Sequence, residues 1–310
     1  MEKNNLTYFY TENYLNYIAE RFIKNNESYT VKNNEYKFFA PILHSDDKVE
    51  SGELSYLSLP YVSGNISDKT LKKEMATYFE KINSLGSKRI ALRQDPLVNY
   101  NNQIIKSILQ EGFEPNLFYT TIIDLNLSQE ILWQNVRKRY KSFINGLEKN
   151  TEYKTVIVDS QNNIGCIEDW IDLYMALIKR GGGCQDRNRM KNVGTAITEN
   201  CGLLYLLYKD KQLISGLNIN YANKFSYYTA GGTHPDFEGL DNFSHYLMWY
   251  LILDLKNRGL DFLEIGPVFY KNVKNFYNHS EKELTISDFK LGMGGKLTPF
   301  FIFEKINETN

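Results

Sequence analysis

The chain has 310 residues, with 36 Lys and Arg against 37 Asp and Glu, so its formal net charge of −1 excludes a global positive field that would gather nucleic acid. Hydrophobic residues make up 42% of the chain, and 20 Gly and 7 Pro are too few for a disordered or fibrous protein. The length fits two globular domains of about 150 residues each.

Neither end nor middle of the chain contains a run of roughly 20 apolar residues, and the opening "MEKNNLTYFYTENYL" lacks the apolar core of a signal peptide. We therefore expect a cytoplasmic protein without a transmembrane segment. Cys166, Cys184 and Cys201 are odd in number and form no C-x-x-C pair, so we expect three free thiols, no disulfide and no metal site.

The first half predicts eight elements in chain order. They are a helix over residues 11–24, a hairpin around residues 32–35, a third strand in residues 53–64, a helix from Asp68 to Leu85 capped by Asp68, a strand over 88–93, a helix over 102–112 closed by Gly112, and a strand over 117–125.

The second half begins with one helix over residues 128–149, capped by Ser128, then a strand over 153–159 and two helical segments between residues 167 and 200. A hairpin around residues 209–211, a strand over 224–232, a long helix over 241–258 and a strand over 260–266 follow. A helical stretch near residues 273–278 and strands over 285–292 and 298–305 complete it.

Antiparallel strands that lead into a strand–helix–strand unit thus occur twice, which predicts an internal duplication. We expect two mixed α/β (α+β) domains, residues 1–126 and 127–310, with the order of elements better determined than their boundaries.

This element order resembles the GNAT fold, the fold of acyl-CoA N-acyltransferases. Residues 122–149, 227–268 and 286–295, the last reading "ISDFKLGMGG", resemble three blocks of the FemABX-like superfamily. The resemblance implies two tandem GNAT-like domains with the donor site in the C-terminal one. Two departures are the missing helical arm of the longer Fem enzymes and Met293, where an aromatic residue is usual.

The superfamily contains two kinds of enzyme. Some are peptidyltransferases that move amino acids from aminoacyl-tRNA onto peptidoglycan precursors, and others are relatives that acylate amino sugars of surface glycans. By this resemblance, Phe289 and Lys290 lie beside the donor ester or thioester, where the ammonium group stabilises negative charge. Thr229, Ala230, Gly231 and Gly232 lie where GNAT proteins hold the donor, beside a break in strand pairing.

The remaining candidates follow from their residue types. Amide formation from an activated donor needs no serine or cysteine nucleophile, only positioning, an oxyanion donor and a base for the amine. Asp261 or, preferably, Glu264 at the end of a strand is the candidate base. The candidate acids for the leaving group are Tyr228, Tyr270 and Tyr277, with Tyr228 chosen among them.

Three arginines are candidate acceptor ligands. Arg137 and Arg139 could hold a sugar or nucleotide phosphate through forked hydrogen bonds, and Arg187 lies in a glycine-rich loop expected near the acceptor. Acidic residues precede the long helix and oppose a CoA diphosphate there: Asp236, Glu238 and Asp241.

We therefore expect an enzyme that transfers an acyl group directly to an amino group of a nucleotide-sugar or surface-glycan precursor, with no permanently bound cofactor. Acyl-CoA is the preferred co-substrate. One alternative is a tRNA-dependent aminoacyltransferase, with aminoacyl-tRNA as donor and a peptidoglycan precursor as acceptor. A third possibility is a non-catalytic GNAT-fold scaffold of a surface-polysaccharide pathway, because fold alone does not establish activity.

Overall fold

The computed structural model describes residues 7–22, 25–44, 57–182, 187–239, 242–273 and 279–307. It contains two compact units. The N-terminal unit is built mainly from Phe9–Tyr119 and Pro299–Asn310, and the C-terminal unit mainly from Thr120–Lys271 and His279–Thr298. The expected division into two domains at residue 126 stays a prediction.

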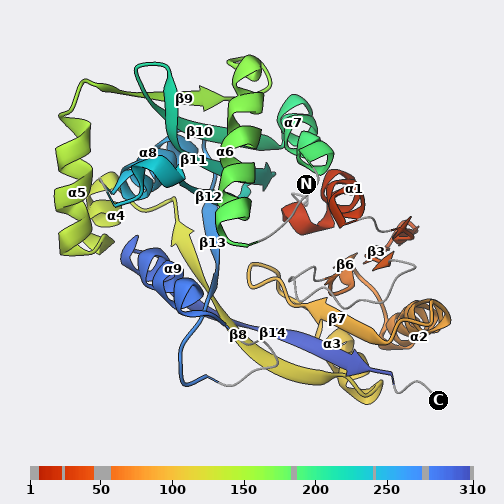
Figure 1. Cartoon of the computed structure of the whole chain (residues 1–310). Helices are drawn as coiled ribbons and strands as arrows, with labels where there is room; N and C mark the ends of the chain where they lie inside the picture. Colours follow the sequence, from red (N-terminus) through yellow and green to blue (C-terminus); the bar gives the residue numbers. More distant parts are fainter. Residues whose placement is uncertain are drawn as a thin grey trace. The chain divides into compact units, whose positions relative to one another are not determined.

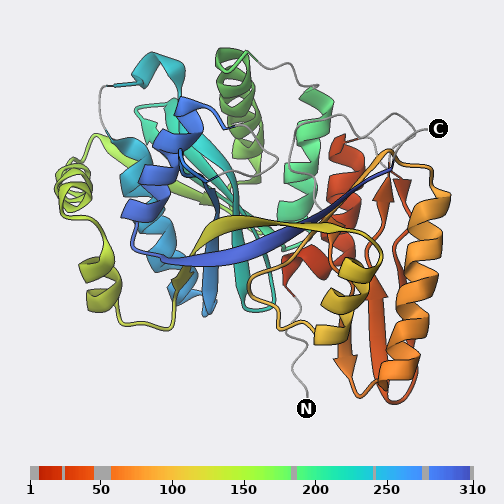
Figure 2. The same ribbon diagram turned by 90° about the horizontal axis from the view of Figure 1, so that it is seen from below.

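The N-terminal unit combines a three-stranded antiparallel sheet, in the order β2-β3-β6, with the strand series β5-β7-β14-β8. Figure 2 shows the two long strands β8 and β14 side by side, drawn in yellow and blue. Its elements are η1 (Tyr8–Tyr10), α1 (Glu12–Phe22), β1 (Asn25–Asn26), β2 (Tyr29–Lys32), β3 (Tyr36–Ala40), β4 (Leu43–His44), β5 (Leu57–Ser58), β6 (Tyr61–Gly64), α2 (Asp68–Ser84), β7 (Arg89–Arg93), α3 (Asn102–Gln110), β8 (Glu114–Asp124) and β14 (Lys296–Ile306).

The C-terminal unit has the strand order β8-β13-β12-β11-β10-β9, to which β8 contributes its second half. Its further elements are α4 (Gln129–Asn135), α5 (Lys138–Glu148), β9 (Tyr153–Val158), η2 (Ile164–Cys166), α6 (Ile167–Arg180), η3 (Arg187–Met190), α7 (Lys191–Thr198), β10 (Gly202–Lys209), β11 (Gln212–Ala222), β12 (Phe225–Thr233), η4 (Pro235–Phe237), α8 (Phe243–Asn257), β13 (Phe262–Val268) and α9 (Glu281–Gly292).

Helices cover both faces of this sheet (Figure 1). On one face, α4, α5 and α8 bury a core that includes Leu247, Ile252 and Leu263. On the other face, α6 and α7 bury a second core around Trp170 and Leu204. Strands with covered faces on both sides read as continuous apolar runs, as in "LLYLLY" of β10.

Most expected elements are confirmed, including both hairpins, the long helix α8 and the cap at Ser128. Gly112 also follows α3 as expected, with a positive φ of 86° that glycine adopts without strain. The helix α2 is capped by Ser67, whose side chain accepts a hydrogen bond from the Thr70 amide, so the expectation that Asp68 is the cap is wrong.

Two further expectations are wrong because tertiary contacts interrupt the local pattern. The third strand is divided at Leu59 and Pro60 into β5, which pairs with β7, and β6, which pairs with β3. The single helix over 128–149 is two helices, because Val136 is extended and the Arg137 amide donates to the carbonyl oxygen of Gly292 instead of continuing the helix.

The largest difference concerns residues 285–292, which belong to helix α9 and not to a strand. Ser280 and Glu283 form a reciprocal capping box at the start of α9, which fixes its first turn. Four expectations lie outside the described residues, wholly or in large part: the helical stretch near residues 273–278, the thiol of Cys184, Asp241 and Tyr277. Cys166 and Cys201 are free thiols.

In the described part of the chain, no helix is long and apolar enough to cross a membrane. The same residues contain no group of three or more His, Cys, Asp and Glu side chains that could hold a metal ion.

Candidate active site

The adjacent strands β12 and β13 pair over a short distance and then part. Their parallel register covers three residue pairs, the last of which joins Tyr227 to Glu264. Beyond this point every residue of β12 up to Thr233 is half-exposed, whereas β11 on its other side is buried from Ile214 to Asn220. The parting therefore exposes strand edges inside the sheet, where backbone groups can bind a ligand.

A β-bulge lies at the same place on the other side of β12. Asn218 of β11 pairs with Ala230 and the next residue, Ile219, pairs with Tyr228, so Thr229 is the extra residue. The Thr229 hydroxyl donates to the backbone carbonyl oxygen of Asn218 at 3.0 Å and contacts the Asn218 side-chain oxygen. The break in pairing expected at residues 229–232 is thus present at Thr229.

The two glycines of this stretch lie where side chains have no room. A Cβ atom at Gly231 would lie 2.8 Å from the Gly216 carbonyl oxygen, and one at Gly232 would lie 3.0 Å from a methyl group of Leu177 on α6. Close packing explains both glycines, and donor binding by residues 229–232 stays a prediction.

Lys290 lies near the C-terminal end of α9 and is 9% exposed. Its ammonium group donates a 2.8 Å hydrogen bond to the carbonyl oxygen of Pro267, at the end of β13. Burial lowers the pKa of Lys290 to about 8, and the nearby Glu264 carboxylate acts in the opposite direction. At neutral pH the ammonium form predominates, so the group can stabilise negative charge.

Glu264 is the buried acid of the site, at 1% exposure in the middle of β13. The Thr120 hydroxyl of β8 donates a 2.9 Å hydrogen bond to Glu264 Oε1. Leu263 and Ile265 point into the core beneath α8, so Glu264 points to the opposite face of the sheet. Asp261, the other candidate base, precedes β13.

Gly266 lets the helix side and the sheet side of the site approach each other. A Cβ atom at this position would lie 3.4 Å from Lys290 Nζ and 3.8 Å from the Tyr227 hydroxyl oxygen. Gly266 also has a φ of 88°, which favours glycine. The absence of a side chain therefore leaves space for the ammonium group beside β13.

The glycines after Lys290 are explained by packing. A Cβ atom at Gly292 would overlap the Tyr140 ring of α5, and one at Gly294 would lie 2.8 Å from the backbone of Asn135. Gly295 similarly approaches Thr121 of β8. The concentration of glycine in "LGMGG" thus lets α9 end tightly against α4, α5 and β8, which fixes the helix that carries Lys290. Met293 is buried in the same core.

Arg137 and Arg139 are both bound to Asp288, two residues before Lys290. Arg137 donates to both oxygens of Asp288 at 2.8 and 2.7 Å, and Arg139 donates to one of them at 2.7 Å. Hydrogen bonds from Arg137 and the charges of both arginines lower the pKa of Asp288. The two guanidinium groups are also the part of the site where an anion of an acceptor could bind, which stays a prediction.

Phe289 packs edge-to-face against His245, with ring centroids 4.9 Å apart. His245 also contacts the rings of Tyr140 at 4.2 Å and Phe143 at 5.5 Å. Burial lowers the pKa of His245 to about 4, so the imidazole is neutral at physiological pH. This aromatic cluster holds the end of α9 against α5 and α8.

Two predicted site residues have no printed contact with Lys290 or Glu264. Arg187 forms ion pairs with Glu168 at 2.7 Å and with Asp172, both on α6. Tyr228 packs against the core beneath α8, and burial raises the pKa of its phenol. Its neighbour Tyr227 is the tyrosine that lies opposite Glu264, and no motif distinguished it in the sequence.

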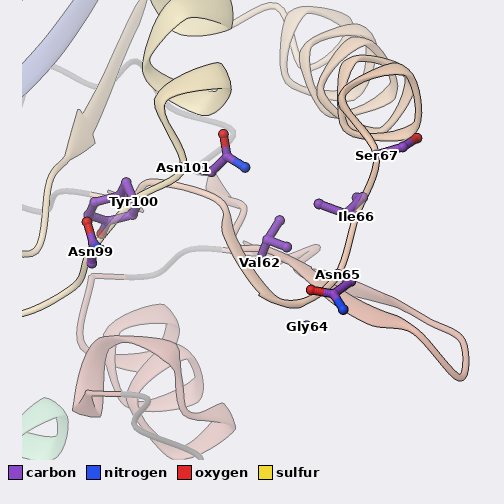
Figure 3. A pocket seen from close by; sticks show the side chains of 8 residues that line it. All are labelled: Val62, Gly64, Asn65, Ile66, Ser67, Asn99, Tyr100 and Asn101. Atoms are coloured by element: carbon purple, nitrogen blue, oxygen red, sulfur yellow. The ribbon is translucent and has the colours of Figure 1, made fainter.

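A separate pocket of about 530 Å³ lies in the N-terminal unit (Figure 3). The residues before α2 and before α3 line it, and none of them is charged or belongs to the predicted site: Val62, Gly64, Asn65, Ile66, Ser67, Asn99, Tyr100 and Asn101.

No family model and no curated protein matches the sequence. Solved structures do match the fold. FemX has a TM-score of 0.69 at 12% identity, over 97% of this chain and 93% of that protein. The C-terminal domain of a putative lysylphosphatidylglycerol synthetase from Agrobacterium fabrum has a TM-score of 0.60 at 11% identity, over 94% of this chain and 88% of that one.

A tandem GNAT protein from the clavulanic acid biosynthesis pathway is also similar, with a TM-score of 0.51 at 9% identity, over 96% of this chain and 95% of that protein. These similarities confirm the fold that the three sequence blocks implied. The chain has the mixed α/β fold of FemX and of tandem GNAT proteins.

Proposed function

We propose that the protein is an acyltransferase that forms an amide bond by direct transfer of an acyl group from an activated donor to an amine. The carrying observation is the meeting of Lys290 and Glu264 at the point where β12 and β13 part. The opened strand edges would hold the donor, and the Lys290 ammonium would stabilise the oxyanion that develops on its carbonyl. Glu264 would accept the proton of the amine.

The acceptor we propose is an amino group of a nucleotide-sugar or surface-glycan precursor. Support comes from Arg137 and Arg139, whose guanidinium groups lie near Lys290 through their shared partner Asp288. A phosphate of a nucleotide sugar could join this cluster through forked hydrogen bonds. The work of the protein would then belong to cell-envelope polysaccharide synthesis, in the cytoplasm.

The donor has two candidates, acyl-CoA and aminoacyl-tRNA. Asp236 and Glu238 stand exposed in the turn before α8, although Glu238 is paired with Arg180. Their negative charge opposes a CoA diphosphate at that turn. This observation favours the second candidate function, a tRNA-dependent aminoacyltransferase, and so does the similarity to FemX and to a protein named as a lysylphosphatidylglycerol synthetase.

A thermal-shift screen tests the proposal and separates the donors. The panel is CoA, acetyl-CoA, UDP-linked amino sugars and aminoacylated total tRNA. A ligand at a hundred times its Kd adds about 2.7 kcal/mol to the stability of the folded state. We expect one donor class to raise Tm, and to do so less in the Gly231→Leu variant, where a large side chain fills the parting beside β12. A panel without any stabilising donor would contradict acyl transfer and favour a scaffold.

A further inference from the structure

Tyr227 and Tyr228 are neighbours in the sequence but point to opposite faces of β12. Tyr228 packs against the core beneath α8. Tyr227 is paired in register with Asn220 of β11 on one side and with Glu264 of β13 on the other. Because paired residues of adjacent strands share a face, Tyr227 lies on the face that carries the Glu264 carboxylate.

A row of polar side chains therefore crosses four neighbouring strands. It runs from Asn220 through Tyr227 and Glu264 to Thr120, which donates to Glu264. Asn220 is 1% exposed, and neither polar atom of its amide has a hydrogen-bond partner among the described residues. Burying such an amide costs stability, so the row is not what core packing alone would select.

The hydroxyl group of Tyr227 also approaches Lys290. Its oxygen lies 3.8 Å, and Lys290 Nζ 3.4 Å, from the position that a Cβ atom would take at Gly266. Phenol and ammonium therefore border one small volume, where β13 leaves its pairing with β12.

Exposure separates Tyr227 from its two charged neighbours. Glu264 and Lys290 are buried, whereas Tyr227 is half-buried, as are the residues of β12 that follow it. A buried carboxylate can take a proton from an amine at the strand parting only through a polar group that reaches both. On this face of β12 the register gives that position to Tyr227.

We propose that Tyr227 is the catalytic residue that carries protons between the reacting amine and Glu264. The inference rests on the acyl-transfer function proposed above. As the new C–N bond forms, the amine gives a proton to the Tyr227 oxygen while the Tyr227 proton passes to the Glu264 carboxylate. When the donor C–S or C–O bond breaks, Glu264 returns the proton through Tyr227 to the leaving sulfur or oxygen. Lys290 stays charged throughout and neutralises the carbonyl oxygen.

The experiment compares Tyr227→Phe with Tyr228→Phe in the full-length protein. Both variants remove one hydroxyl group from adjacent positions of β12, so Tyr228→Phe is the matched control. Transfer is followed with acetyl-CoA in one arm and aminoacylated total tRNA in the other, each with UDP-linked amino sugars as acceptors. Tm and the KM for the donor are recorded for every protein.

We expect Tyr227→Phe to lower kcat about 100-fold or more, the range of general acid–base catalysis, with Tm and donor KM unchanged. The solvent deuterium isotope effect on kcat should also change in Tyr227→Phe, which a purely structural role would not cause. Tyr228→Phe should keep kcat within about threefold of wild type. A Tyr227→Phe protein as active as wild type would overturn the proton-carrying role alone, whereas a wild-type protein inactive in both arms would overturn the proposed function with it.

Discussion

The Lys290 ammonium donates a 2.8 Å hydrogen bond to the carbonyl oxygen of Pro267, which joins the end of α9 to the end of β13. Three close approaches hold the helix in this place: Gly292 on Tyr140, Gly294 on Asn135 and the ring contact of Phe289 with His245. The cation therefore occupies a fixed position beside the parting strands before any ligand binds. Preorganised charge of this kind needs no rearrangement during the reaction.

Stability should depend on the titration of Lys290. The pKa of Lys290 is about 8 in the folded protein and 10.5 in the reference state, so between these pH values the unfolded chain holds more protons at this residue. Its contribution to the free energy of unfolding therefore rises with pH across this window, by up to about 3 kcal/mol. Urea unfolding at pH 8 and pH 10 should show this rise in wild type relative to Lys290→Met, and parallel curves for the two proteins would contradict the burial of the ammonium.

Glu264→Gln should change the pH dependence of activity as well as its magnitude. Burial lowers the pKa of Lys290 and the Glu264 charge raises it, so loss of that charge should lower the Lys290 pKa further below 8. The alkaline limb of the kcat profile should move to lower pH, and kcat should fall about 100-fold with the loss of the base. Thr120 can still donate to the amide oxygen of Gln, so an unchanged Tm is the control, and an unmoved alkaline limb would contradict the coupling.

Gly292→Ala should destabilise the protein, whereas Gly146→Ala should not. An added Cβ at Gly292 overlaps the Tyr140 ring, and overpacking of this kind costs about 1–3 kcal/mol. Gly146 lies in α5 with no atom within 4 Å of an added Cβ, so alanine there should stabilise the helix by about 0.5–1 kcal/mol. Equal Tm values for the two variants would contradict the close packing of α9.

His245 should stay neutral well below the pH at which histidine usually titrates. Burial among Tyr140, Phe143 and Phe289 lowers its pKa to about 4. Because its folded pKa is depressed below 6.5, the stabilising contribution is present above pH 6.5 and is lost as the pH falls toward 4. An NMR titration of the imidazole should have its midpoint near 4, and a midpoint above 6 would show that the ring cluster is open to water.

The sequence predicted most local structure because its turns and caps are local signals. Ser128, Gly112 and the Lys209–Lys211 turn each act through residues next to them, and each is where expected. Helix α9 was misread as a strand because "TISDFKLG" is short and contains β-branched residues. The capping-box spacing from Ser280 to Glu283 was the available signal for a helix.

The candidate site could be predicted only in part. Lys290, Phe289 and Glu264 were found because sequence blocks and strand ends mark them. Tyr227 and Thr120 were missed because their nearness to Glu264 depends on the register of β12 and β8 against β13, which pairs residues up to 144 positions apart. Asp288 was missed for the same reason, since its partners Arg137 and Arg139 belong to a distant helix start.

The most direct measurement is the rate of acyl transfer by Lys290→Met compared with Lys296→Met, using whichever donor class stabilises the wild-type protein. Lys296 is an exposed lysine six positions farther along, at the start of β14, and serves as the matched loss of charge. We expect kcat to fall about 100- to 1,000-fold in Lys290→Met, as on removal of an oxyanion donor, with folding retained, and to stay near wild type in Lys296→Met. Full activity in a folded Lys290→Met protein would contradict the placement of Lys290 at the reacting carbonyl.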